Sequence, residues 1–151
     1  MSPKEEKAIK LFSNGSSYNC AQAVVGVFSE ESGLDADTAF KISNGFGGGI
    51  RGGNVCGAVS GAVMAVGLKC GFSVEGDMAQ KRYCYEKTDE FIKKFTDENG
   101  SVLCRDLLGI DIRSPEDFKN PEVREKFGTV CPNMIAAAVR IVDNMEFERG
   151  S

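Results

Sequence analysis

Cysteine is the residue type through which this chain could do chemistry. The 151 residues include six cysteines and no histidine, so the commonest general base and the commonest nitrogen ligand of metals are both missing. Thiolates ligate metals and attack disulfides. A metal site would therefore be built from thiolates, and the alternative is redox turnover of the thiols themselves. No Cys-x-x-Cys pair occurs, which excludes a thioredoxin-like site and a standard ferredoxin motif.

Four of the cysteines fall in or next to the first turn of a predicted helix: Cys20, Cys56, Cys104 and Cys131. Free backbone N–H groups and the helix dipole favour negative charge there, so this setting should promote the thiolate. The four belong to the second, fourth, sixth and eighth predicted segments. In an up-and-down bundle, helices of the same parity begin at the same end. We therefore expect the four thiols to meet at one buried end, although four buried apolar residues would be the plainer interpretation.

The other two cysteines have a different setting. Cys70 lies at the end of its predicted helix and Cys84 in the interior of a long one, where free cysteine commonly acts as a small hydrophobic residue. We interpret both as structural.

Helical periodicity organises the whole chain. It predicts helices over residues 3–13, closing near Gly15, and then over 19–32, 35–44, 55–70, 75–97, 101–108, 114–127 and from 131 to about 145. The small residues Gly57, Gly61 and Ala65 stand four apart, which permits close approach of a neighbouring helix and makes their helix central. No strand, repeat or linker is evident. The expected fold is all-α: a single-domain bundle of about six to eight helices over residues 1–151.

A glycine-rich segment, residues 46–54, precedes the central helix and is too dense in glycine for a helix or strand. Gly47, Gly48, Gly49 and, at the helix start, Gly57 would let backbone N–H groups approach a bound cofactor. The same glycines could equally make only a tight turn. Arg51 in this loop is a candidate anion-binding group, although an isolated loop arginine is more often simply solvated.

Charge and composition exclude several partners. A net charge of -4 and a pI near 5.0 argue against nucleic acid, which would require a basic face. Residues 1–7 carry mixed charge, unlike a secretory signal, so we expect a cytoplasmic protein. The longest uncharged stretch, residues 52–68, is too short to span a membrane, and no membrane insertion is expected. A reducing compartment makes a static disulfide framework unfavourable.

At these residues the sequence resembles the C-GCAxxG-C-C family of putative redox-active proteins. The matching segments are Tyr18–Ala23, Phe46–Ile50 and Cys56–Ala62, followed by Cys104 and Cys131, and they span nearly the whole chain. The central motif reads Cys-Gly-Ala-x-x-Gly here, an order that differs from the family's label. The resemblance implies redox activity without naming a reaction, and family members often lie near transporter or oxidoreductase genes.

A related domain occurs in split-Soret cytochromes that carry an iron–sulfur centre, and this resemblance implies that the cysteines are cluster ligands. The chain lacks the haem-attachment pattern Cys-x-x-Cys-His, so haem is not expected.

Three hypotheses follow. In the first, Cys20, Cys56, Cys104 and Cys131 bind a metal centre, an iron–sulfur cluster before a structural zinc, for electron transfer or redox sensing. In the second, the protein is a thiol–disulfide oxidoreductase without a cofactor, with Cys56 as the nucleophile because its helix start would lower its pKa. In the third, it is a non-catalytic accessory protein of a transporter or oxidoreductase. A redox partner protein is expected, and a homodimer is compatible with each hypothesis.

Overall fold

The computed structural model describes residues 1–13 and 16–148, and helices account for nearly all of its regular structure. The α-helices in chain order are α1 (Pro3–Phe12), α2 (Cys20–Ser32), α3 (Ala36–Ser43), α4 (Gly57–Cys70), α5 (Met78–Asn99), α6 (Cys104–Leu108), α7 (Pro121–Thr129) and α8 (Cys131–Asn144). Short helical turns are η1 (Asn44–Phe46), η2 (Gly49–Gly53) and η3 (Pro115–Lys119). The all-α prediction is confirmed. Gly15, where the first helix was expected to close, lies outside the described residues.

Side-chain caps begin the first two helices. The hydroxyl of Ser2 accepts a hydrogen bond from the Glu5 backbone N–H, and the Glu5 carboxylate accepts one from the Ser2 N–H in return. Asn19 and Gln22 make the same reciprocal pair at the start of α2. Each pair satisfies two backbone donors that a helix start leaves without a partner. The local sequence therefore determines where α2, and with it Cys20, begins.

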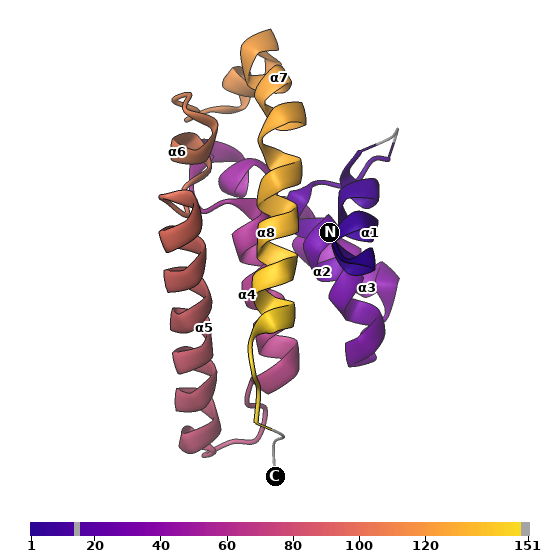
Figure 1. The fold of residues 1–151 in the computed structure, drawn as a ribbon, viewed down its shortest axis with the longest axis vertical. Coiled ribbons are helices and arrows are strands. Elements are labelled where there is room, and N and C mark those ends of the chain that lie inside the picture. Colours follow the sequence, from indigo (N-terminus) through magenta and orange to yellow (C-terminus); the bar gives the residue numbers. More distant parts are fainter. Residues whose placement is uncertain (14–15, 149–151) are drawn as a thin grey trace.

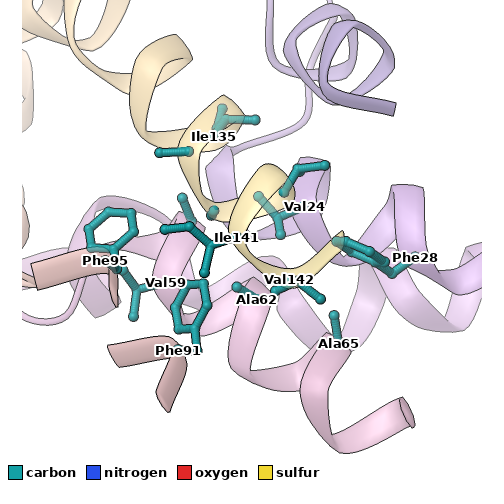
Figure 2. Packing of buried hydrophobic residues seen from close by; sticks show 14 of the residues in the cluster. Val24, Phe28, Val59, Ala62, Ala65, Phe91, Phe95, Ile135, Ile141 and Val142 are labelled. Atoms are coloured by element: carbon teal, nitrogen blue, oxygen red, sulfur yellow. The ribbon is translucent and has the colours of Figure 1, made fainter. Parts of the chain in front are cut away.

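The helix α4 lies at the centre of the bundle (Figure 1). It packs against α2, α5 and α8, while α1 packs against α2 and α8. The long α5 runs beside α4 and α8 in the opposite direction. Figure 2 shows the apolar side chains that meet in this core, among them Phe28 from α2, Val59 from α4, Phe91 from α5 and Val142 from α8. The central position predicted for this helix agrees with the structure.

Glycine allows α2 and α4 to approach closely. A Cβ atom at Gly61 would lie 2.8 Å from the backbone oxygen of Ala21 and 3.0 Å from the Cβ of Val24. Real Cβ atoms do not approach backbone that closely, so any larger residue would push the two helices apart. By contrast, Gly67 in the same helix has open space around it.

The buried residues form two clusters. The larger one, the main core, is built from α1, α2, α4, α5 and α8. The smaller one, here called the minor core, holds Cys104, Leu108, Ile112 and Val123, with Phe118 and Phe127 packed against it. It belongs to residues 104–131, which lie at the upper end of the molecule in Figure 1.

Four element boundaries differ from the predictions. The short sixth helix begins at Cys104 and not near Ser101, and its N-cap is Leu103. The central helix begins at Gly57, because Val55 is drawn into an isolated antiparallel bridge with Leu103. The long helix begins at Met78 after an Asp77 cap. The helix predicted over residues 114–127 is wrong: it is divided into η3 and α7 at Asn120. Asn120 precedes a proline and takes ψ 123°, because the proline ring disfavours the helical conformation of the residue before it.

Among the described residues, no helix combines the length and the apolar character needed to cross a membrane.

Candidate functional site

Four cysteines from four helix starts line one cavity of about 320 Å³. Cys20 is the first residue of α2, Cys56 precedes α4, Cys104 begins α6 and Cys131 begins α8. The structure thus brings together the four residues that the sequence singled out. The other lining residues are Phe12, Asn19, Asn44, Gly47, Gly48, Arg51, Gly57, Phe118 and Phe127.

Contact with Gly57 fixes the position of the Cys20 thiol. A Cβ atom at Gly57 would collide with the Cys20 Sγ, and it would lie 3.1 Å from both the Ala21 nitrogen and the Phe46 oxygen. Glycine at position 57 therefore leaves the space that the sulfur occupies. Gly57, which begins α4, and Cys20, which begins α2, are therefore in direct contact at the cavity.

The bridge between residues 55 and 103 places the next two thiols. The Cys56 N–H donates to the Val102 oxygen, and the Cys104 N–H donates to the Asn54 oxygen, each at 2.7 Å. Both cysteines follow directly on a bridge residue, Val55 or Leu103. The backbones at Cys56 and Cys104 are therefore tied to each other although they are far apart in the sequence.

Cys131 has a different backbone setting. It follows α7 almost without a break, since Val130 is helical and its N–H donates to the Lys126 oxygen at 2.8 Å. The next residue is Pro132, which has no N–H to offer. The prediction that free backbone donors surround this thiol is therefore wrong. Cys131 is half-buried, whereas Cys20, Cys56 and Cys104 are each less than 8% exposed.

A left-handed turn forms one wall of the cavity. Gly48, Gly49, Ile50 and Arg51 follow one another with φ values of 66°, 68°, 53° and 63°. Only glycine adopts this conformation without strain, and a β-branched residue such as isoleucine is rare in it. The Arg51 guanidinium lies 4.7 Å from the centre of the Phe118 ring at the cavity. The sequence predicted an irregular loop here, but it did not indicate a left-handed one.

The glycines proposed as cofactor contacts have distinct positions. Gly47, Gly48 and Gly57 line the cavity. Gly49 is buried behind it, where an added Cβ would lie 2.9 Å from the Cβ of Cys104 and 2.5 Å from the Asn54 nitrogen. Gly49 therefore packs the wall against α6. Whether any of the four contacts a cofactor stays a prediction.

Burial dominates the electrostatics of the site. It raises the pKa of Cys56 to about 12 and that of Cys104 to about 11, and repulsion from the Cys20 thiolate adds to both shifts. The pKa values of Cys20 and Cys131 are also raised by burial. The expectation that helix starts would promote the thiolate, and lower the pKa of Cys56, is wrong. Helix-end effects are small beside the cost of placing an unpaired charge in an apolar cavity.

Backbone donors nevertheless divide the four thiols into two pairs. The backbone N–H groups of Gly48, Ala21 and Ala58 near the Cys20 sulfur partly oppose the rise of its pKa. Those of Val59 and Ala58 do the same at Cys56. No such donors contribute at Cys104 or Cys131 in the described chain. One side of the cavity therefore offers hydrogen bonds to sulfur and the other does not.

The donor set suits a thiophilic metal centre, because four cysteine thiolates are the usual ligands of iron–sulfur clusters and of structural zinc. Within residues 1–13 and 16–148, however, no three His, Cys, Asp or Glu side chains are close enough together to hold one metal ion. The four thiols surround a space instead of converging on a point.

The cavity contains residues that the sequence reasoning did not identify. Asn19, predicted only as the first residue of its helix, is the N-cap of α2, and its Nδ2 donates to the Asn44 oxygen at 2.9 Å. Phe118 and Phe127 stack with their ring centres 5.9 Å apart. They come from the segment that was predicted as one helix, so their joint position could not be inferred from periodicity.

Fold and site together define a small all-α protein with four cysteines, three of them buried, around one cavity. Residues 18–145 match the model of the family described as "Putative redox-active protein (C_GCAxxG_C_C)". The chain belongs to this family, and the resemblance drawn from the cysteines and glycines is confirmed. Neither the search of curated proteins nor the search of solved structures found a match.

Proposed function

We propose that the four-cysteine cavity holds an iron–sulfur cluster that serves electron transfer or redox sensing. The observation that carries this proposal is that Cys20, Cys56, Cys104 and Cys131 line a single cavity of about 320 Å³, although they come from four different helices. Four thiolates match the ligand count of a cluster. The membership of the chain in a redox-active family is consistent with this chemistry.

The protein's own groups would bind and tune the cluster, which supplies one-electron redox chemistry when bound. The four cysteine sulfurs would ligate the iron. The backbone N–H groups of Gly48, Ala21 and Ala58 lie near the Cys20 sulfur and favour its negative charge, and those of Ala58 and Val59 do the same at Cys56. Hydrogen bonds to ligating sulfurs raise a cluster's reduction potential.

The raised pKa values favour a cationic occupant. Without one, burial keeps Cys56 and Cys104 protonated at neutral pH, since their pKa values are about 12 and 11. Each ionised thiol also repels the others, which adds to the shift at Cys131. Bound iron would offset the cost of burying the thiolates and their mutual repulsion because its positive charge pairs with them. The thiols would release their protons on binding.

Zinc is the alternative metal, and it would use the same four cysteines in a structural role. Thiolates that share one ion must lie close together, and in the described residues no three candidate ligands do so. A cluster binds its thiolates on separate irons, which requires less contraction of the cavity. This arrangement favours the cluster over zinc.

A second candidate is thiol–disulfide exchange by two of the cavity cysteines, with Cys56 as the nucleophile. The close grouping of four thiols supports it. A pKa of about 12 opposes it, because at neutral pH on the order of one Cys56 thiol in 10⁵ is ionised.

The deciding experiment is purification without oxygen, followed by an absorption spectrum and analysis of iron, zinc and sulfide. We expect brown protein with iron and sulfide in wild type and in the control Cys70→Ser, and colourless protein in Cys56→Ser. If the analysis finds zinc but no sulfide, the site is a structural zinc site and not an iron–sulfur cluster. Metal-free protein with reactive thiols would overturn the proposal in favour of thiol exchange. If the wild-type protein contains no metal and the Cys56→Ser variant folds normally, the accessory role would be favoured.

A further inference from the structure

The two cysteines outside the cavity lie together at the far end of α4. Cys70 is the last residue of α4 and is 4% exposed, and Cys84, in the second turn of α5, is half-buried. Cys70 belongs to the main core, and Cys84 packs against it. Because α4 has 14 residues, they lie about 20 Å along its axis from the cavity.

Hydrogen bonds hold Cys70 beside the start of α5. Cys84, one turn after Gln80 on that helix, lies close enough to contribute to the raised pKa of the Cys70 thiol. The Cys70 Sγ donates to the Val66 oxygen at 3.3 Å, which fixes its rotamer over the last turn of α4. The Gln80 Nε2 donates to the Cys70 backbone oxygen at 2.7 Å. This last bond ties the end of α4 to the first turn of α5, so the two backbones are held at the position of the pair.

The surroundings of the pair differ from those of the cavity. The Lys87 ammonium lies one turn beyond Cys84 on α5 and favours the Cys70 thiolate, although burial raises the pKa of Cys70 to about 12. Lys87 is itself paired with Glu90 at 3.2 Å. Cys84 has a solvent-exposed side, while Cys70 lies behind it. A small oxidant from solution would therefore meet Cys84 first.

We propose that Cys70 and Cys84 form a second redox site: a reversible disulfide couple that exchanges electrons with small-molecule disulfides and is independent of the cavity. The Cys84 thiolate attacks the disulfide, forms a mixed disulfide and releases one small thiol. The Cys70 sulfur then attacks the Cys84 sulfur of the same molecule, and its proton leaves with the second small thiol. Because this step is intramolecular, proximity offsets the small ionised fraction of Cys70, whereas Cys56 would have to attack an external disulfide. In sum, two electrons and two protons pass from the pair to the small disulfide, and one bond joins α4 to α5.

The test uses oxidised glutathione as the probe on the folded protein. After incubation, free thiols are blocked in acid and the protein is digested with trypsin. Cleavage after Lys69, Lys81, Arg82 and Lys87 separates Cys70, in residues 70–81, from Cys84, in residues 83–87. We expect these two peptides to be found joined by a disulfide and to separate on reduction. The oxidised protein should unfold at a temperature higher by about 5 °C or more.

Matched variants identify the order of attack. Cys70→Ser should stop at glutathione bound to Cys84, and Cys84→Ser should leave Cys70 unmodified. Cys56→Ser should still form the joined peptide. This result would show that the disulfide couple does not depend on the cavity cysteines or on a cluster bound by them. Wild-type protein that carries glutathione on Cys84 without forming the joined peptide would overturn the proposal. It would mean that α4 and α5 do not bring the two Cα atoms within the roughly 7 Å that a disulfide requires.

Discussion

Because Gly57 has no side chain, the Cys20 sulfur can occupy the space beside it. Because a Cβ atom there would collide with that sulfur, Gly57→Ala should displace the thiol while leaving α4 helical. If the cavity binds iron, we expect the variant to lose at least half of it, as measured by iron analysis after purification without oxygen.

Gly67→Ala is the matched control for this substitution, since the same helix offers open space at Gly67. It should keep its iron and gain up to about 1 kcal/mol of stability from better helix propensity. Circular dichroism establishes that both variants are folded. Full iron content in folded Gly57→Ala would contradict the contact between this residue and the ligand Cys20.

The raised pKa of Cys56 makes the metal-free protein sensitive to alkaline pH. The folded pKa is about 12 and the unfolded one about 8.5, so the thiol stabilises the folded state below pH 8.5. This contribution is lost as the pH rises from about 8.5 to 12, because only the unfolded chain ionises in that range.

Urea unfolding of metal-free protein at pH 7 and pH 10 measures this effect. The loss of unfolding free energy should be smaller in Cys56→Ser than in wild type by about 2 kcal/mol. Other groups that titrate near pH 10 are common to both proteins and cancel in the comparison. An equal loss in both proteins would mean that Cys56 is not buried as a neutral thiol.

Among the described elements, the left-handed turn at residues 48–51 places non-glycine residues in a backbone conformation that they disfavour. Ile50 has a φ of 53°, and it is 53% exposed. Packing of its side chain therefore does little to offset the backbone strain. Asparagine tolerates this conformation. Ile50→Asn should therefore raise the unfolding free energy of the metal-free protein by about 1 kcal/mol in urea unfolding.

Ile42→Asn is the control, since Ile42 is 64% exposed in α3 with ordinary helical backbone. It should be neutral or slightly destabilising. If both substitutions had the same effect, exposure and not backbone strain would explain the gain at Ile50.

Elements differ in how far the sequence predicts them. The start of α2 was predicted to within one residue, whereas the start of α4 was placed two residues too early because the bridge at Val55 depends on a distant segment. The break at Asn120 was also encoded, by the proline that follows, but apolar periodicity concealed it. The left-handed turn could not be predicted, since Ile50 adopts a conformation that its own local preference disfavours. The pKa values were mispredicted because burial depends on the whole fold.

At the scale of the whole molecule, the cavity lies between the two cores. Cys20 and Cys56 belong to the main core, while Cys104 and Cys131 belong to or pack against the minor core. A group bound by all four would therefore join the cores. The minor core is small, so its amides should exchange faster than those of the main core in metal-free protein.

Hydrogen exchange measured with and without the bound metal tests this arrangement. Loading should slow exchange by tenfold or more over residues 104–130 and leave residues 58–66 and 135–142 nearly unchanged. Uniform protection of all these segments would show that the two cores open together, and that the cavity is not a boundary between them.

The distribution of the four cavity cysteines along the chain also determines when the site can exist during synthesis. Cys20 is translated early and Cys131 only after seven of the eight described helices. Three cysteines must therefore wait, unpaired, until α8 has been made and has docked. During that interval they are exposed to oxidants and to unsuitable metals. If the cavity binds a cluster, the cluster would have to be delivered after translation, and slow delivery would leave the three cysteines that are made first open to oxidation.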